Sequence, residues 1–189
     1  NSSSLSLIMD LGHTPPCDSL LSKGQLNEPE VHYPLRLLKC DDCDLVQIDY
    51  VVDPKILYQQ NYPYESSLTN LGKKHYSEFA KSIVKEYNLN KNNLSVDIGS
   101  NTGVLLSAFR ENNLKIVGID PAPNICKISI RKGIPTINSF FNRDAVNKIL
   151  KKHGKAKAIT ATNVFAHVND LTLFMKNIKR LMHKNKAIF

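Results

Sequence analysis

The hydrophobic positions follow two different patterns along the chain, and the change falls near Leu68. After Leu68, short apolar runs alternate with longer segments in which apolar residues recur every three or four positions. Short apolar runs are typical of buried strands, and the longer spacing is typical of amphipathic helices. The runs predict strands at 94–98, 115–119, 134–138 and 156–161, with a further strand from Lys186. The periodic segments predict helices at 71–87, 104–111, 124–132, 143–153 and 169–182.

Residues at the ends of these segments predict where the helices begin and stop. Gly154 is placed to close the fourth helix, and either Asn169 or Asp170 is placed to cap the last one. Strands and helices that alternate at this spacing form a parallel sheet covered by helices on both faces. We therefore expect an α/β fold with a doubly wound, mostly parallel sheet over residues 66–189.

The first region, residues 1–65, is rich in Pro, Asp, Tyr and Cys and shows no long helical period. Two short runs, 34–40 and 45–50, are strand-like and flank the sequence Cys40-Asp-Asp-Cys43-Asp44. A strand, a tight turn and a second strand form a hairpin, here with both cysteines at its tip. We expect a small, β-rich, zinc-ribbon-like region ahead of the sheet domain.

The cysteines favour a metal site over disulfides. The chain contains four: Cys17, Cys40, Cys43 and Cys126. This is not the framework of a secreted disulfide-rich protein, so a reducing cytoplasm is expected. A redox-active C-x-x-C would open a helix, whereas two thiolates at a hairpin tip provide half of a tetrahedral zinc site. The nearby candidates for the other two ligands are His13, Cys17 and His32.

Composition and charge exclude some classes of protein. Of the 189 residues, 42% are hydrophobic, which is ordinary for a globular chain. No apolar run approaches the roughly 18 residues of a membrane span, and no secretory signal peptide is visible. The net charge is +8, but residues 143–186 hold 11 basic and 2 acidic groups, a local balance of +9. Lysines on helix faces are mostly solvated surface. We therefore interpret this local excess as surface charge and do not expect nucleic acid as a partner.

A glycine-containing loop follows the first strand of the sheet region and carries candidate chemistry. The sequence Asp97-Ile-Gly99-Ser100-Asn101-Thr-Gly103 ends that strand and opens a helix. It is neither the dinucleotide fingerprint nor a phosphate-binding Walker loop. The D-x-G-x-x-x-G form is similar to motif I of S-adenosylmethionine (SAM) methyltransferases. Gly99 and Gly103 lack a Cβ, which would let the backbone approach a ligand closely.

An acidic residue ends the next strand, 23 residues after Asp97. A carboxylate at Asp120 can accept hydrogen bonds from both ribose hydroxyls of an adenosine. The same geometry serves other nucleotides, so Asp120 alone does not select SAM. A doubly wound domain that binds another nucleotide, or none, remains the alternative.

Two further segments carry polar groups that could take part in catalysis. Tyr62 and Tyr64 lie in Tyr62-Pro-Tyr-Glu-Ser-Ser67, just ahead of the sheet domain, where phenols could exchange protons or simply pack. Asn163 and His167 follow the fourth strand, which places them at the carboxyl edge beside the glycine loop. A lone histidine is usually structural, but this edge is where ligands bind in open α/β sheets.

Together these residues resemble one family, the zinc-containing SAM-dependent C-methyltransferases of deoxysugar biosynthesis, which act on nucleotide-linked 4-keto sugars. The matching segments are Asp10-Leu-Gly-His13, Tyr33-Pro-Leu, Cys40-Asp-Asp-Cys43, Tyr62-Pro-Tyr64, Asp97 to Gly103, Gly118-Ile-Asp-Pro-Ala122, Gly133-Ile, Phe140-Phe141 and Asn163 to Val168. They cover almost the whole chain in order. The resemblance implies a class I, Rossmann-like SAM methyltransferase fold that is truncated at its fifth strand.

The resemblance also implies that this chain is the N-terminal half of a longer protein. Similar proteins carry another C-x-x-C before the segment matching Asn1-Ser2, and a sugar-nucleotide domain beyond Phe189. The zinc would be structural, with Cys40 and Cys43 as the ligands present, and Cys17 falls where the family needs no cysteine. Many relatives have Glu in place of Asp97 and Asp in place of Thr102, and neither change forbids SAM binding.

The family chemistry implies roles for individual residues. A base would remove a proton next to the 4-keto group, and His167, Tyr62 and Tyr64 are the candidates for deprotonation or for enolate stabilisation. Asp120 would hold the ribose and Gly99 to Asn101 the methionine part. The full expected cofactor set is Asp97, Gly99, Ser100, Asn101, Gly103, Asp120, Phe140, Phe141 and Asn163, with the two phenylalanines flanking adenine. A methyltransferase acting on O or N, and a non-catalytic zinc-ribbon protein that binds RNA, are the rival hypotheses.

Overall fold

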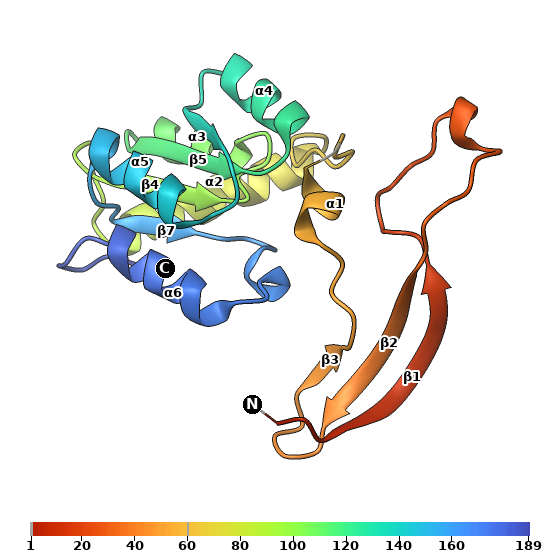
Figure 1. Ribbon diagram of the computed structural model, residues 1–189. Coiled ribbons are helices and arrows are strands. Elements are labelled where there is room, and N and C mark those ends of the chain that lie inside the picture. Colours follow the sequence, from red (N-terminus) through yellow and green to blue (C-terminus); the bar gives the residue numbers. More distant parts are fainter. Residues whose placement is uncertain (1, 60) are drawn as a thin grey trace. The chain divides into compact units, whose positions relative to one another are not determined.

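The computed structural model describes residues 2–59 and 61–189, so Asn1 and Gln60 lie outside the described residues. The chain divides into two compact units, Asn1–Pro63 and Tyr64–Phe189. Figure 1 shows a small strand-rich unit and a larger unit of alternating strands and helices. Each unit is described by itself below.

The first unit is built on a three-stranded antiparallel sheet of order β1-β2-β3. Its strands are β1 (Leu5–Thr14), β2 (Tyr33–Cys40) and β3 (Val46–Ile48). The short 3-10 helix η1 (Lys23–Gln25) lies between β1 and β2, and helix α1 (Pro54–Tyr58) follows the sheet. The expected hairpin with the two cysteines at its tip is confirmed, because β2 and β3 pair antiparallel around residues 41–45.

The hydrophobic pattern predicted neither β1 nor α1. The pairing of β1 with β2 shifts register between Leu7 and Met9 and again between Asp10 and His13. Each shift changes which residues of β1 face a given side of the sheet, so a continuous two-residue alternation is lost. Nine of the ten β1 residues are also exposed. The sequence of β1 therefore does not show the alternation of buried and exposed positions by which a strand is predicted.

The second unit contains a four-stranded sheet of order β6-β5-β4-β7. All three neighbouring pairs are parallel. The strands are β4 (Leu94–Ile98), β5 (Lys115–Asp120), β6 (Thr136–Asn138) and β7 (Ala158–Thr160). Where a further strand was expected, Ile188 forms a single parallel bridge to Ala158 on the outer side of β7.

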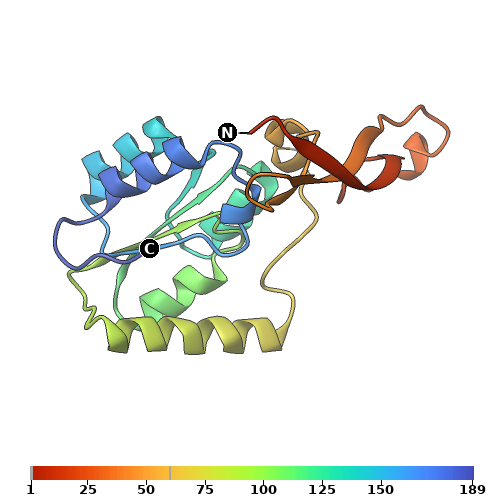
Figure 2. The same cartoon turned by 90° about the horizontal axis from the view of Figure 1, so that it is seen from below.

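Helices cover both faces of this sheet, so the doubly wound α/β prediction is confirmed. The helices are α2 (Asn70–Glu86), α3 (Val104–Glu111), α4 (Pro123–Arg131), α5 (Arg143–His153) and α6 (Leu171–Leu181), with the 3-10 helix η2 (Phe165–His167) before α6. Figure 2 shows α2 and α3 on one side of the sheet and α5 and α6 on the other. Each face has its own apolar cluster, one containing Phe109 and the other Phe174.

Side-chain caps fix where several of these helices begin. Thr69 accepts a hydrogen bond from the Gly72 amide at the start of α2, and Asn142 caps α5 in the same way. Of the two caps considered for the last helix, Asp170 is the one that accepts, from the Leu173 amide. Each cap satisfies an amide that has no partner inside its helix. Because α5 and α6 follow the parallel strands β6 and β7, they start at the carboxyl edge of the sheet.

Candidate functional site

The glycine loop after β4 is held against the end of β5. The amides of Gly99 and Ser100 both donate to the Ile119 carbonyl, at 2.8 and 3.0 Å. Because β4 and β5 are parallel neighbours, their carboxyl ends lie side by side. The predicted proximity of the glycine loop and Asp120 therefore exists in the structure.

The carboxylate of Asp120 connects the glycine loop to the residues that follow β5. One oxygen accepts from the Asn101 amide and the other from the Ala122 amide, both at 2.9 Å. Burial raises the pKa of Asp120, and the two amide hydrogen bonds oppose that rise. A carboxylate offers about four acceptor positions, and these two hydrogen bonds use one on each oxygen. The carboxylate therefore fits the cofactor that the resemblance implies.

Asp97 is a second buried carboxyl group at the same edge. It is 3% exposed, and its Oδ1 accepts from the Thr160 hydroxyl of β7 at 2.6 Å. Burial raises the pKa of Asp97 to about 7, with the charge of Asp120 adding to the rise and the Thr160 hydrogen bond opposing it. Asp97 therefore links β4 to β7 and carries a proton much of the time at neutral pH.

The two glycines of the loop are explained by the packing around them. Both have left-handed backbones, with φ of +67° at Gly99 and +79° at Gly103. A Cβ at Gly99 would overlap the Val164 side chain, and one at Gly103 would overlap Ile134. The space beside these glycines is thus filled by the protein's own side chains. Their contact with a ligand, expected from the sequence, stays a prediction.

The segment ahead of α2 is hydrogen-bonded to the glycine loop. Asn101 Nδ2 donates to the Tyr64 carbonyl at 3.0 Å, and Asn101 Oδ1 accepts from the Ser66 amide at 2.8 Å. The Tyr64 side chain is 56% exposed. The structure therefore brings Tyr64 to the glycine loop. Tyr62 belongs to the first unit, where its ring contacts that of Tyr58 at 6.0 Å.

The remaining expected residues lie in the loops after β6 and β7. Asn163 has a left-handed backbone with φ of +56°, and His167 is an exposed residue of η2. The Phe141 ring packs on Phe174 of α6, with centroids 5.0 Å apart, and it borders the apolar cluster on that face. Phe140 is half-buried just after β6. Of the two phenylalanines expected to flank adenine, Phe141 is thus already in contact with α6.

The hairpin tip between β2 and β3 holds the C-x-x-C cysteines in a compact turn. The Asp44 amide donates to the Cys40 carbonyl at 3.0 Å, and the Cys40 amide donates to the Leu45 carbonyl at 2.9 Å. Backbone N–H groups of Asp42 and Cys43 hold the pKa of the Cys40 thiol below its usual value. A lowered thiol pKa favours the thiolate, which is the form that binds metals.

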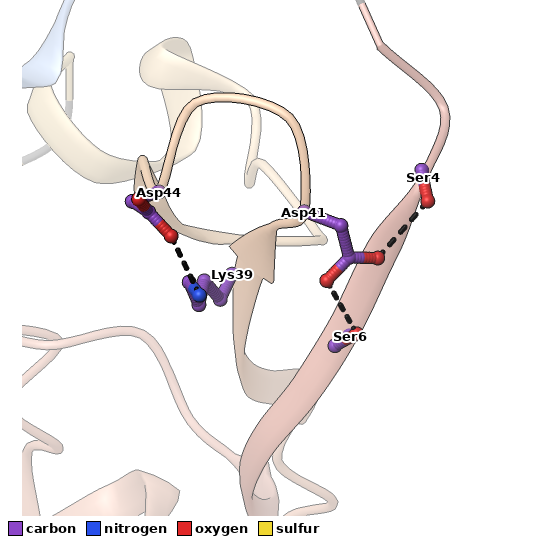
Figure 3. Close-up of polar contacts among 5 residues, drawn as sticks. All are labelled: Ser4, Ser6, Lys39, Asp41 and Asp44. Carbon is purple, nitrogen blue, oxygen red and sulfur yellow. Dashed lines mark hydrogen bonds and ion pairs between the residues drawn. The ribbon is translucent and has the colours of Figure 1, made fainter.

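Polar side chains brace this turn, as Figure 3 shows. Asp41 accepts from the hydroxyls of Ser4 at 3.0 Å and Ser6 at 2.6 Å, which hold the pKa of its carboxyl below the usual range. Lys39 forms an ion pair with Asp44 at 2.6 Å. The start of β1 is thereby tied to the turn that carries the cysteines.

The register of the hairpin decides which candidate ligands can reach these thiols. Leu5 pairs with Cys40 at one end of β1, whereas His13 pairs with Pro34 near the other. Cys17 and His32 lie beyond that far end. The structure therefore does not bring any of the three candidates, His13, Cys17 or His32, to the thiols of Cys40 and Cys43. In the described part of the chain no three metal-ligating side chains form a cluster. Two thiolates of this hairpin tip would supply two of the four ligands of a tetrahedral zinc site.

No helix among the described residues is long and apolar enough to cross a membrane. This agrees with the absence of long apolar runs in the sequence.

Comparison with known families gives a match to each unit. Residues 73–189 match the model of a family described as "Methyltransferase domain". Residues 1–58 match the model of a family described as "Putative zinc binding domain". The boundary between the two matches falls in the same stretch as the boundary between the two compact units.

A curated relative and several solved structures are also similar to this chain. The relative is C-methyltransferase NovU from Streptomyces niveus, 28% identical over 182 residues, which cover 96% of this chain and 43% of that protein. The chain thus spans less than half the length of this relative. A SAM-dependent methyltransferase from Clostridium acetobutylicum gives a TM-score of 0.48 at 17% identity, covering 59% of this chain and 46% of that one. Magnesium protoporphyrin IX methyltransferase from Synechocystis, with bound SAM, gives 0.46 at 13% identity, covering 58% and 54%.

Proposed function

This chain belongs to the methyltransferase family that its residues 73–189 match, and from that premise we propose that it methylates a carbon atom of a nucleotide-linked 4-keto-deoxysugar. It is a SAM-dependent methyltransferase with the class I fold. Its residues 1–58 match a family of zinc-binding domains. The carbon acceptor is supported by the C-methyltransferase relative, which aligns with 96% of the chain. The sugar is supported by the motifs at Tyr62–Ser67 and Asn163–Val168.

The single observation that carries the cofactor assignment is the environment of Asp120. Its carboxylate is braced by two backbone amides and retains acceptor positions for two ribose hydroxyls. Gly99, Ser100 and Asn101 follow in the loop beside it and would hold the methionine part. Bound SAM supplies an electrophilic methyl group on a sulfonium. The chain's own task is to orient that group and to exclude water from it.

Carbon methylation requires a base and a stabiliser for the resulting oxyanion. A proton on the carbon beside a ketone is acidic because its removal gives an enolate. His167, exposed at the carboxyl edge, is the candidate to take that proton, and Tyr64 is the candidate to donate a hydrogen bond to the enolate oxygen. Tyr62 keeps the same candidate role. Asn163 would border the cofactor in the loop after β7.

Zinc has a structural part in this proposal. Cys40 and Cys43 would provide two thiolates in the turn that Asp41 and Lys39 brace. A zinc site closed by four protein ligands leaves no position for a substrate. No step of the methyl transfer therefore passes through the metal.

Binding of SAM tests the cofactor site directly. We expect Asp120→Ala to weaken SAM binding at least about tenfold by calorimetry, because a braced, charged acceptor of two hydroxyl groups is lost. Asp144→Ala, which removes an exposed carboxylate in the first turn of α5, is the matched control. Asp120→Asn keeps one acceptor oxygen and covers the case in which the alanine variant does not fold. Unchanged affinity in both Asp120 variants would refute the assignment.

The acceptor is tested with a nucleotide-linked 4-keto-6-deoxysugar and SAM. The expected product carries one additional methyl group by mass, and NMR places it on carbon beside the ketone. Methylation on oxygen or nitrogen would overturn the proposed acceptor chemistry while leaving the SAM site intact. His167→Asn should lower turnover strongly with SAM affinity unchanged. Undiminished turnover would remove His167 from the reaction.

A further inference from the structure

The side chain of Asn101 connects two segments that are 35 residues apart in the sequence. Its Nδ2 donates to the Tyr64 carbonyl at 3.0 Å. Its Oδ1 accepts from the Ser66 amide at 2.8 Å and from the Thr102 amide at 2.8 Å. The amide group thus pairs with the backbone on both sides of Glu65, much as a neighbouring strand would.

The backbone of the same residue is fixed by the cofactor-binding carboxylate. The Asn101 amide donates to Asp120 Oδ2 at 2.9 Å, and Asn101 has a left-handed conformation with φ of +48°. Asn tolerates this conformation better than most residues other than Gly. One residue therefore contacts Asp120 through its main chain and the Tyr64–Ser66 backbone through its side chain.

Two further contacts attach this segment to the same part of the second unit. The hydroxyls of Ser66 and Thr102 lie 3.3 Å apart, and Lys132 Nζ donates to the Ser67 hydroxyl at 3.2 Å. Thr102 is fully buried, so its hydroxyl gives the Ser66 side chain a fixed partner. On the side of the Tyr64–Ser67 segment, all these contacts use backbone groups or serine hydroxyls. The Tyr64 side chain takes no part in them and is 56% exposed.

We infer that Asn101 is a positioning residue that holds the Tyr64–Ser67 segment in place for the acceptor and couples the order of this segment to an occupied cofactor site. A ligand on Asp120 restrains the Asn101 backbone, and the Asn101 side chain passes this restraint to residues 64–66. This role differs from the direct cofactor contact expected from the sequence. The inference rests on the proposed function only where an acceptor sugar is named.

Hydrogen exchange of the Ser66 amide tests the coupling without any acceptor. Asn101→Gly removes the side chain and keeps the left-handed backbone free of strain. We expect the Ser66 amide to exchange at least about tenfold faster in this variant, roughly the contribution of one net hydrogen bond. Adding SAM to the parent protein should slow exchange across residues 64–67, and this slowing should be lost in Asn101→Gly.

Asn113→Gly is the matched control, because Asn113 also has a left-handed backbone, with φ of +65°, and lies in an exposed turn after α3. This variant should change neither the exchange rate of the Ser66 amide nor the slowing of exchange that SAM causes across residues 64–67. Asn101→Asp, which keeps the acceptor for Ser66 but replaces the donor to Tyr64, should give an intermediate exchange rate. Unchanged Ser66 exchange in Asn101→Gly, or SAM-induced protection that persists there, would overturn the inference.

Kinetics separate positioning from cofactor binding. With the 4-keto sugar nucleotide as acceptor, Asn101→Gly should raise KM for the acceptor at least about tenfold, a larger factor than its effect on the Kd for SAM. A loss of SAM affinity as large as the acceptor effect would make Asn101 a cofactor ligand and overturn the positioning role. If the sugar is no substrate of the parent protein, the proposed function fails, and the exchange experiment still decides the inference.

Discussion

Replacing Asp97 by asparagine should make the stability of the second unit much less dependent on pH. Asp97 is buried at 3% exposure, and its pKa is raised from 3.8 to about 7, chiefly by burial. Each pH unit between the unfolded and folded pKa corresponds to about 1.4 kcal/mol of folding free energy. The rise therefore costs the parent protein about 4 kcal/mol once Asp97 is ionised in both states.

The direction follows from where the proton is held. Between about pH 4 and about pH 7 the folded protein keeps the proton on Asp97 while the unfolded chain loses it. The parent protein thus loses stability as the pH rises through this range, and the loss levels off above about pH 7. The side chain in Asp97→Asn cannot ionise, and burying an amide nitrogen that loses its hydrogen bonds to water costs about 1–3 kcal/mol at every pH. The variant should be less stable than the parent near about pH 4 and more stable near about pH 8.

Urea denaturation followed by far-UV circular dichroism measures this crossing. The helical signal reports on the second unit, because its five α-helices are longer than α1, the α-helix of the first unit. Asp120 is also buried with a raised pKa, and its charge adds to the rise at Asp97, so the comparison of variant with parent reports the ionisation of Asp97 together with its coupling to Asp120. Asp144→Asn, at an exposed site, should show no such crossing. A free-energy difference between Asp97→Asn and parent that stays constant with pH would refute the reasoning.

Three further predictions follow from the packing, the caps and the hairpin tip. Gly103→Ala should lower the free energy of unfolding by about 1–3 kcal/mol in the same denaturation assay, because the new Cβ would overlap Ile134; no loss would show that the loop relaxes freely. Thr69→Ala and Asn142→Ala should each cost about 1 kcal/mol through loss of a helix cap, and the double variant should be additive because the two caps share no partner and their helices lie on opposite faces of the sheet. Cys43→Ser should reduce the zinc retained by the purified full-length protein, measured by elemental analysis, and zinc retained at the parent level would exclude Cys43 as a ligand.

Regular elements of the second unit could be predicted because their signals are local. The structure places β4 at Leu94–Ile98, α3 at Val104–Glu111 and α5 at Arg143–His153, with the bounds that periodicity predicted. Each has a continuous apolar pattern, and α5 also has a cap and a closing glycine. Strands β6 and β7 are shorter than predicted, because the apolar runs extend beyond the residues that pair with β5 and β4.

The meeting of the glycine loop with Asp120 at one edge of the sheet could also be predicted from the sequence. In a parallel sheet with short loops, the segments after successive strands meet at one edge. The positions of the glycine loop and Asp120 after successive strands therefore sufficed to predict that they lie together. The hydrogen bond from the Asn101 amide to Asp120 confirms this proximity.

Only the tertiary structure decided the contacts between segments that are distant in the sequence. The pairing of Asp97 with Thr160 depends on β7 lying beside β4, and the Asn101 link to Tyr64 depends on where the chain enters α2. The register of β1 on β2 separates His13 and Cys17 from Cys40, although all lie in one short region. In the second unit, the sequence by itself determined which regular elements form and at which edge of the sheet the glycine loop and Asp120 meet, because periodicity and caps act within a few residues. Strand order and register determined the partners of each side chain, because they depend on packing of the whole unit.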